Sequence, residues 1–417
     1  MGKAMGEYRV VCSKCGHLQD PYALCCSEDD SLLRTEYAAR TLTVHHLPGM
    51  WRFLDWLPVS GPLREIGSGP VTYRSTGLAR ELGLKELFVT FNGYWPERRA
   101  EMLTCSFKEL EALPTMQRLR EKGGEETFVV ASAGNTGRAF AYVTSLVGAK
   151  AIIVVPTSSQ DRIWVPDIEP KGVHVVAVDG DYYDAIRLAD ALAGQPGFIP
   201  EGGARNVARR DGMGTVLLDA TLAMGALPRH YFQAVGSGTG GISAYEASRR
   251  LLTDGRFGSV LPVLHLAQSI PCAPLYHARM GGESPSSCPK GVYDDVLFNR
   301  RPPYGVPGGV AEALDATGGE VVGVTNGEAG EAKKLFEISE GIDILPAPAV
   351  AVAALIKAVA QGDLGPGDGC VLNITGGGMA RLREDHAIER VKKDLLVAPG
   401  QELGQVMELV QEMLEAS

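Results

Sequence analysis

The sequence predicts an α/β protein with two open, mostly parallel twisted sheets that carry helices on both faces. Short apolar runs rich in β-branched residues recur along the chain, as is typical of parallel strands covered on both faces. Longer helical patterns separate these runs. The chain has 417 residues, of which 45% are apolar, which is enough for roughly two or three domains with a substantial core.

The expected elements begin with a separate small arm, residues 1 to about 45, which holds four of the eight cysteines. Two series of strand–helix units follow, one near 125–200 and one near 230–380. The predicted strands are 86–91, 127–132, 151–156, 173–178, 230–235, 260–267 and 369–375, and the clearest predicted helices are 137–149 and 214–226. The interval 271–310 is rich in proline and glycine, which predicts a long surface excursion.

The charge balance excludes two classes of partner. A formal net charge of −10 argues against nucleic acid or an anionic membrane, because both normally require a basic face. The first residues contain no apolar stretch of signal-peptide length, and the most apolar later run, 346–360, is interrupted by Pro348 and Lys357. We therefore expect a soluble cytoplasmic protein with no nucleic-acid or membrane partner.

The cysteine arm carries half of a metal-binding pattern. Cys12 and Cys15 have the C-x2-C spacing of a zinc knuckle and are followed by glycine. The second half is poor, because Cys25 and Cys26 are adjacent and Asp29 stands three residues after Cys26. The alternatives are a four-thiolate zinc site and a ribbon that folds without metal. The sequence favours the second, so we predict no metal ligands.

The stretch LTCSFKELEA, residues 103–112, places an amine at the start of a helix. Ser106 and Glu109 have the spacing of a capping box, which predicts a helix start here. Lys108 then lies in the first turn, where the helix dipole disfavours a cation by roughly 0.3–1 kcal/mol. A helix N-terminus and partial burial both lower the pKa of an amine, so Lys108 is a candidate nucleophile.

Three strand-to-helix junctions accompany this lysine, and ligands of open α/β sheets bind at such junctions. The first, 129–141, contains Ser132, Asn135 and Thr136, and suits a carboxylate. The second, 233–244, is a glycine loop that suits a phosphate monoester on the next helix. The third, 371–380, delivers Thr375 into a triple glycine, where its hydroxyl suits a ring nitrogen. Taken singly, each junction is equally consistent with an ordinary turn.

The glycine loop also matches the G-x-G-x-x-G pattern of dinucleotide-binding proteins. A dinucleotide would require an acidic residue about 20 positions on, at the end of the next strand. That strand ends in Gln268 and Ser269. A nicotinamide-dependent oxidoreductase is therefore disfavoured. A lysine, a phosphate-sized loop, a serine and asparagine loop and a lone threonine are instead the parts needed to hold pyridoxal 5'-phosphate.

The ordered motifs resemble the β-family (fold type II) of pyridoxal-phosphate enzymes, which are tryptophan synthase β-like, and especially the threonine synthases. The resemblance is carried by the cysteine arm and by 61–65 (GPLRE), 106–108 (SFK), 132–136 (SAGNT), 236–241 (GSGTGG), 340–346 (EGIDILP) and 375–378 (TGGG). It implies a zinc-ribbon-like arm at 1–45, a large cofactor-binding domain at 46–105 and 216–417, and a small mobile domain at 106–215. It also implies a homo-oligomer.

The resemblance also implies a role for each site residue. Lys108 is similar to the catalytic lysine that binds the cofactor covalently, and Asn135 to the residue that faces the ring hydroxyl. Thr375 resembles the neutral partner of the pyridine nitrogen, which suits elimination and replacement rather than transamination. Ser132 and Thr136 would hold the substrate carboxylate. The phosphate would lie in the loop formed by Gly236, Ser237, Gly238, Thr239 and Gly240.

Departures from the threonine synthase pattern imply a different substrate. Glu109-Leu110 stands where threonine synthases usually have Asp-Arg, and 92–105 replaces a short link. The resemblance points to the archaeal branch that makes L-cysteate for coenzyme M from O-phospho-L-serine and sulfite. Threonine synthase, a serine/threonine dehydratase and an inactive binding paralogue are the alternatives. Arginine suits oxyanions best, so we expect an anion contact from at least one of Arg98, Arg99, Arg205, Arg209 and Arg210.

Overall fold

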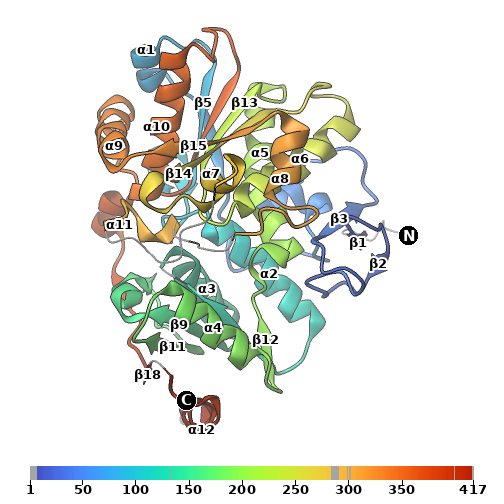
Figure 1. The fold of residues 1–417 in the computed structure, drawn as a ribbon, viewed down its shortest axis with the longest axis vertical. Helices are drawn as coiled ribbons and strands as arrows, with labels where there is room; N and C mark the ends of the chain where they lie inside the picture. Colours follow the sequence, from blue (N-terminus) through green and yellow to red (C-terminus); the bar gives the residue numbers. More distant parts are fainter. Residues whose placement is uncertain are drawn as a thin grey trace.

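The computed structural model describes residues 7–132, 134–282, 291–297, 299, 302–398 and 400–415. Within this part of the chain, two large sheets and one small sheet carry the architecture (Figure 1). The larger sheet has six strands in the order β15-β14-β13-β16-β5-β4. Their bounds are β15 Glu320–Val324, β14 Val263–Ser269, β13 His230–Ala234, β16 Cys370–Ile374, β5 Leu87–Phe91 and β4 Val71–Arg74. All neighbours are parallel except β4, which is antiparallel to β5.

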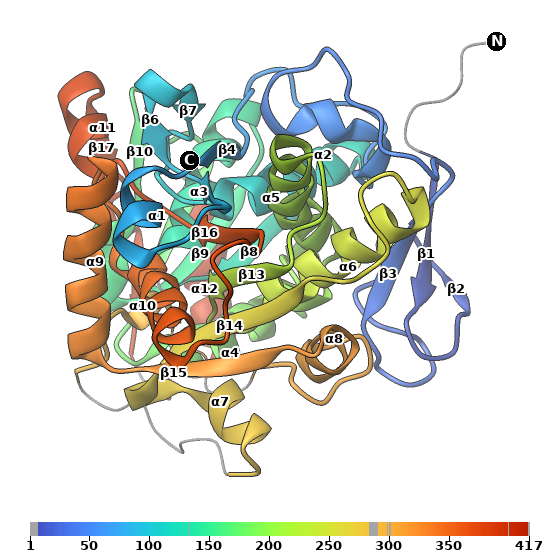
Figure 2. The same ribbon diagram turned by 90° about the horizontal axis from the view of Figure 1, so that it is seen from above.

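Helices cover both faces of this sheet, as the apolar strands predict. Helix α10 (Pro346–Gln361) and helix α9 (Asn326–Glu340) belong to the apolar cluster on one face. Helix α5 (Val207–Met224) and helix α6 (Thr239–Asp254) belong to the cluster on the other. Figure 2 shows the sheet between these two layers. The carboxyl ends of its parallel strands therefore meet at one edge, where loops are free to form a site.

The second large sheet has five parallel strands in the order β12-β8-β9-β11-β18. The bounds are β12 Phe198–Pro200, β8 Thr127–Ala131, β9 Ala151–Pro156, β11 Val173–Val178 and β18 Leu395–Val397. Helix α3 (Asn135–Val147) packs on one face, and helices α4 (Tyr182–Ala193) and α12 (Leu403–Glu415) pack on the other. The predicted α/β class with two open, mostly parallel sheets is confirmed.

The N-terminal arm is a small antiparallel sheet in the order β2-β1-β3, with β1 Tyr8–Cys12, β2 Leu18–Gln19 and β3 Leu33–Tyr37. It packs beside α2, α5 and α6 (Figure 1). Tyr37 donates a hydrogen bond to Asp211 of α5, with 2.6 Å between Oη and Oδ2. The arm is thus attached to the helix that runs from the site into the core.

Shorter elements complete the described chain. They are α1 Gly77–Leu82, β6 Tyr94–Trp95, β7 Ala100–Glu101, α2 Lys108–Lys122, β10 Trp164–Pro166, α7 Pro274–Arg279, α8 Val310–Thr317, α11 Met379–Asp385 and β17 Ile388–Arg390, with 3-10 turns at Gly49–Trp56, Pro96–Arg98, Thr157–Arg162, Gly203–Arg205, Ile270–Cys272 and Asp295–Leu297. No helix among the described residues is both long and apolar enough to cross a membrane.

The predicted strands and helices agree with these bounds apart from their ends. The helix expected at 214–226 is the C-terminal part of α5, which begins at Val207. The division of the chain into a large and a small domain stays a prediction. Strand β18 lies in the range 216–417 that was predicted for the large domain. It pairs with β11, so it belongs to the five-stranded sheet.

Candidate active site

A cavity joins the loops of both large sheets. It is lined by the start of α2, the loop before α3, the loop between β13 and α6, and the end of β16. Every residue that the sequence predicted for the site lies in this lining, namely Lys108, Ser132, Asn135, Thr136, Gly236, Ser237, Gly238, Thr239, Gly240 and Thr375. Residues up to 267 positions apart in the sequence are therefore brought to one place by the sheet topology.

The predicted capping box is wrong. Helix α2 begins after Phe107, whose side chain does not cap it, and the Ser106 hydroxyl oxygen accepts from the N–H of Lys108 at 3.4 Å rather than from that of Glu109. The Glu109 carboxylate instead accepts hydrogen bonds from the N–H and the hydroxyl of Thr104, at 3.0 and 2.8 Å, and from the Ser68 hydroxyl. Burial raises the pKa of Glu109 above its usual value. The Glu109 side chain thus stabilises the turn before Lys108 and does not accept from the backbone N–H of Ser106, as a capping box would require.

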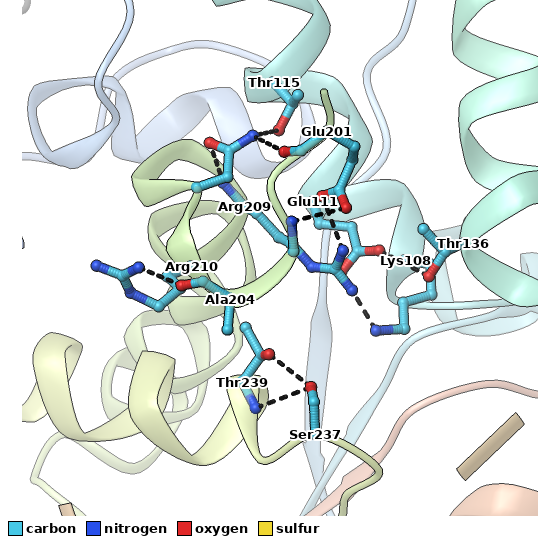
Figure 3. Close-up of polar contacts among 12 residues, drawn as sticks. Lys108, Glu111, Thr115, Thr136, Glu201, Ala204, Arg209, Arg210, Ser237 and Thr239 are labelled. Atoms are coloured by element: carbon cyan, nitrogen blue, oxygen red, sulfur yellow. Dashed lines mark hydrogen bonds and ion pairs between the residues drawn. The ribbon is translucent and has the colours of Figure 1, made fainter. Parts of the chain in front are cut away.

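Lys108 is held where an amine can be neutral. Its side chain is 22% exposed, and its Nζ lies 3.2 Å from Oε2 of Glu111 (Figure 3). Burial lowers the pKa of Lys108, and the nearby Arg209 charge lowers it further, whereas the Glu111 carboxylate opposes both effects. The preceding N–H, that of Phe107, donates to the carbonyl of Thr375 at 3.0 Å. The lysine and Thr375 are therefore fixed to one another through the backbone.

Glu111 is the centre of a buried charge network that sequence reasoning missed (Figure 3). Its Oε2 lies 2.8 Å from Nε of Arg209, and its Oε1 accepts from the Thr136 hydroxyl at 3.0 Å. Arg209 also donates to Glu201, with 2.7 Å between Nη1 and Oε1. The available signal was spacing, because residues three apart on a helix face the same side and Glu111 is three residues after Lys108.

The loop before α3 uses its small polar side chains on its own backbone. The Ser132 hydroxyl oxygen accepts from the N–H groups of Gly134 and Gly137, at 3.0 and 2.7 Å. The Asn135 side-chain oxygen accepts from Arg138 Nη2 at 2.8 Å. Both side chains are thereby fixed at the cavity wall. The Ser132 hydroxyl hydrogen and the Asn135 amide nitrogen are donor groups that a ligand can use.

The glycine loop forms the start of helix α6. Gly238 precedes α6 with φ of 82°, a conformation that favours glycine, and the Ser237 hydroxyl oxygen accepts from the N–H of Thr239 at 3.4 Å. A Cβ on Gly240 would overlap the amide of Gln233. The hydroxyls of Ser237 and Thr239 lie 2.7 Å apart beside these N–H groups (Figure 3). Backbone N–H groups and two hydroxyls at the start of a long helix suit a phosphate group.

Gln268 shows why the dinucleotide pattern is incomplete here. Its amide donates to the carbonyl of Gly236 at 3.0 Å and accepts from the N–H of Leu275 at 2.9 Å. An acidic residue at this position would lose the donor that holds the glycine loop. The position where a dinucleotide-binding protein has its ribose-binding acidic residue is thus occupied by Gln268, which supports the glycine loop.

The five candidate arginines differ in whether they reach the cavity. Arg209 alone among them lines it. Arg205 forms a paired contact with Asp30 of the arm, at 2.6 and 2.7 Å, and Arg210 is buried against Glu246. Arg98 lies over the Tyr73 ring, 3.8 Å from its centroid. Arg99 is an exposed residue at the end of a 3-10 turn.

The expectation of a surface excursion at 271–310 is partly wrong. Residues 283–290, 298, 300 and 301 lie outside the described residues. Of those described, Val296, Leu297 and Asn299 line the cavity, and Leu297 is buried. Asp295 forms an ion pair with Arg162, which follows β9 of the other sheet. This segment therefore covers the cavity, and its proline and glycine content gave no signal of that role. Tyr182 and Ala347 are further lining residues that the sequence did not indicate.

Comparisons with known proteins agree with this geometry. Residues 69–376 match the family described as pyridoxal-phosphate dependent enzyme. The chain is 53% identical to the cysteate synthase of Methanococcoides burtonii over 99% of both chains. It is 57% identical to the cysteate synthase of Methanothrix thermoacetophila, over 94% of this chain and 96% of that protein.

Solved structures share the fold at much lower identity. Diaminopropionate ammonia lyase from Escherichia coli superposes with a TM-score of 0.60 at 17% identity, over 91% of this chain and 96% of that one. A pyridoxal 5'-phosphate-dependent aspartate racemase gives a TM-score of 0.60 at 18% identity, over 74% of this chain and 90% of that one. These likenesses support the fold.

Proposed function

The chain belongs to the family of pyridoxal-phosphate dependent enzymes, and we propose that it catalyses the reaction for which its relatives at 53% and 57% identity are named, the synthesis of L-cysteate. The substrates would be O-phospho-L-serine and sulfite, and the products L-cysteate and phosphate. The observation that carries the proposal is the convergence of all predicted site residues on one cavity.

The residues of the cavity fit pyridoxal 5'-phosphate. In this proposal the start of α6 and the hydroxyls of Ser237 and Thr239 hold the phosphate, because the N-terminus of a long helix presents backbone N–H groups to an anion. Lys108 binds the cofactor covalently. Asn135 faces the ring hydroxyl, and the Thr375 hydroxyl faces the pyridine nitrogen. A hydroxyl is a neutral partner, so the nitrogen keeps little positive charge, which suits replacement chemistry.

Lys108 is the proposed base for the substrate Cα proton. When bound, pyridoxal phosphate withdraws electrons from Cα and makes its proton acidic. The substrate amine would first replace Lys108 on the cofactor and so free its Nζ. Lys108 Nζ then takes the Cα proton as a neutral amine, which the lowered pKa of Lys108 favours. Glu111, 3.2 Å away, stabilises the ammonium while it holds the proton, and Lys108 then returns the proton to Cα. The Cβ–O bond to phosphate breaks, and a Cβ–S bond to sulfite forms.

The remaining cavity groups would position the anionic substrates. Ser132 and Thr136 hold the substrate carboxylate in this proposal. Arg209 is the arginine that reaches the cavity, and its guanidinium offers charge-assisted hydrogen bonds to the phosphate or sulfite oxyanions. Its pairing with Glu111 and Glu201 fixes the orientation of the guanidinium and keeps it from folding back over Lys108.

A product assay tests the function. The purified enzyme with pyridoxal phosphate should release phosphate from O-phospho-L-serine, and with sulfite it should form a product with the mass of cysteate. O-phospho-L-homoserine and L-threonine serve as competing substrates. Conversion of phosphohomoserine to threonine, or of threonine to ammonia and a keto acid, at a kcat/KM above that for phosphoserine and sulfite would replace the proposal by a threonine synthase or a dehydratase.

The expected homo-oligomer, the cytoplasmic location and the division into a large and a small domain stay predictions. The small domain proposed at 106–215 would contribute Lys108 and the loop before α3, and the large domain the glycine loop and Thr375. Size-exclusion chromatography with light scattering would measure the oligomeric state directly.

A further inference from the structure

The N-terminal arm brings three sulfur atoms and one carboxylate oxygen to a single point. Atoms of Cys12, Cys15, Cys26 and Asp29 all lie within 4.8 Å of one another. Sγ of Cys15 lies 3.7 Å from Sγ of Cys26, and Sγ of Cys12 lies 3.7 Å from Oδ1 of Asp29. In a tetrahedral zinc site with Zn–S bonds of about 2.3 Å, neighbouring sulfurs are about 3.8 Å apart. The spacing matches that of a tetrahedral metal site.

These cysteines are not bonded to one another. All three are free thiols, and a sulfur separation of 3.7 Å is far beyond the S–S bond of about 2.05 Å. Two of the three lie away from solvent, since Cys12 and Cys26 are buried, whereas Cys15 is exposed. A sulfur–sulfur distance of 3.7 Å without a covalent bond fits two thiolates bound to one tetrahedral cation.

The backbone around the cluster is arranged to stabilise thiolates. The N–H groups of Lys14 and Cys15 point at Sγ of Cys12, at 3.3 and 3.4 Å. The N–H of Glu28 points at Sγ of Cys26 at 3.5 Å. Zinc binds the thiolate form of cysteine, and such outer contacts orient the ligands and reduce their charge. In each turn the N–H two residues after the cysteine therefore points at its sulfur, from Lys14 to Cys12 and from Glu28 to Cys26.

Asp29 completes the set in place of a fourth cysteine. Its Oδ1 accepts from the N–H of Ser31 at 3.1 Å, which fixes the carboxylate, and its Oδ2 lies 3.7 Å from Nζ of Lys14. Lys14 offsets part of the negative charge that three thiolates and a carboxylate would give a divalent cation. The sequence pattern required a second C-x2-C pair, whereas the fold brings a carboxylate oxygen of Asp29 to that corner.

We propose that Cys12, Cys15, Cys26 and Asp29 bind one zinc ion as a structural site. Three thiolates select a soft, tetrahedral metal, and four protein ligands leave no open position for a substrate. This assignment stands on the arm alone and does not depend on the proposed reaction.

The position of the cluster gives the metal a structural task. Cys12 and Cys26 pack in one apolar cluster with Val207, the first residue of α5. Arg209 of the active-site network follows two residues later. The metal would thus hold the arm against the end of α5 that positions Arg209, on the side of the molecule seen at the right of Figure 1.

A second, weaker cluster serves as the internal comparison. Cys15, His17 and Glu28 also lie within 4.8 Å, but all three are exposed. His17 and Glu28 already contact one another, with 2.8 Å between Nδ1 and Oε1. The two clusters share only Cys15, so Asp29 belongs to the first cluster alone and His17 to the second alone.

Metal analysis of the full-length holoenzyme and four variants tests the proposal. The wild type, purified from zinc-supplied cells under reducing conditions, should hold one zinc per chain after dialysis against EDTA. Cys15→Ser and Asp29→Ala should lose the zinc. Cys25→Ser and His17→Ala, matched controls in the same arm, should keep it. The visible band of bound pyridoxal phosphate, retained in every variant, would show that the rest of the chain is folded.

Cobalt substitution gives a readout on the wild type itself. Cobalt(II) held by thiolates in a tetrahedral site should show intense d–d bands at longer wavelength than the yellow cofactor. A wild type without zinc, zinc retained in Cys15→Ser, or an iron centre or Cys15–Cys26 disulfide in its place would overturn the proposal. Loss of zinc in His17→Ala with retention in Asp29→Ala would assign the other cluster and overturn it as well.

Discussion

Lys108 Nζ lies 3.2 Å from Glu111 Oε2, one turn further along α2, with the Glu111 side chain fully buried. The same carboxylate contacts Arg209 and Thr136, so one acidic group connects the amine, a cavity arginine and the loop before α3. Because the amine is largely withdrawn from solvent, its protonation depends on this neighbour. The pair therefore allows a direct test of how the site controls its base.

Replacing Glu111 by glutamine should lower the pKa of Lys108 further. The Glu111 carboxylate raises the pKa of Lys108, against the effect of burial. An uncharged amide would not raise it, so burial would lower the pKa further. Catalysis requires the neutral amine, so the acidic limb of the kcat profile should move to lower pH. A pH titration of kcat measures the shift. Glu121→Gln on the same helix is the control, and an unmoved acidic limb in Glu111→Gln would contradict the proposed coupling.

Lys108→Ala should abolish the covalent attachment of the cofactor. The wild type should be yellow, with a visible band that borohydride removes by fixing the cofactor on the protein. In the variant, borohydride should leave no cofactor covalently attached to the protein. Cysteate formation should fall by at least about 10³-fold, because the base is lost as well. Mass spectrometry after borohydride reduction measures the covalently attached cofactor. Lys122→Ala, an exposed lysine at the other end of α2, should behave as the wild type.

The strands and the site loops could be predicted from the sequence for a common reason. Buried parallel strands are continuous apolar runs, and the loops that follow them carry small residues that a backbone close to a ligand requires. Each signal is local in the chain. The predicted residues Lys108, Asn135 and Thr375 lie together because loops of both large sheets meet at one cavity.

The parts that could not be predicted depend on contacts between distant segments. Glu109 has the spacing of a capping residue, yet its carboxylate bonds to Thr104 and Ser68 because both are brought to it by the turn and by a loop 41 residues earlier. Val296 and Leu297 belong to a segment whose composition resembles a surface loop, yet they line the cavity. Composition reports local conformation, whereas burial is set by what packs on the segment.

Arg209→Ala should raise the KM for both anionic substrates. A charge-assisted hydrogen bond is worth about 1.5–3 kcal/mol, so the expected rise is roughly 10- to 100-fold for phosphoserine or sulfite. Arg209→Lys should recover only part of the loss, because an ammonium cannot reproduce the guanidinium contacts with both Glu111 and Glu201. Steady-state kinetics with each substrate varied in turn measures both effects.

Arg98→Ala is the matched control for this change. Arg98 comes from the same set of candidate arginines but lies over the Tyr73 and Trp95 rings, outside the cavity lining. Its loss should leave both KM values within about twofold of the wild type, since surface changes away from a site rarely exceed about 0.5 kcal/mol. Unchanged KM values in Arg209→Ala would show that the oxyanions bind through other groups.

A histidine pair in the six-stranded sheet should make the protein less stable in mild acid. His230 Nδ1 lies 3.0 Å from His265 Nε2, and His265 Nδ1 lies 2.7 Å from Glu320 Oε1. Burial and the neighbouring His265 lower the pKa of His230 from 6.5 to about 4, against the opposing charge of Asp368. Between pH 6.5 and about pH 4, His230 is therefore protonated in the unfolded chain and neutral in the folded chain.

The stability that the neutral His230 contributes is fully present above pH 6.5 and is lost as the pH falls towards about 4. Between pH 7.5 and pH 5 this single group should lower the free energy of unfolding by about 2 kcal/mol, and His230→Gln should reduce the drop by that amount. Urea unfolding at the two pH values measures it, with the exposed His46→Gln as control. An equal drop in His230→Gln and the wild type would mean that His230 is already protonated in the folded protein.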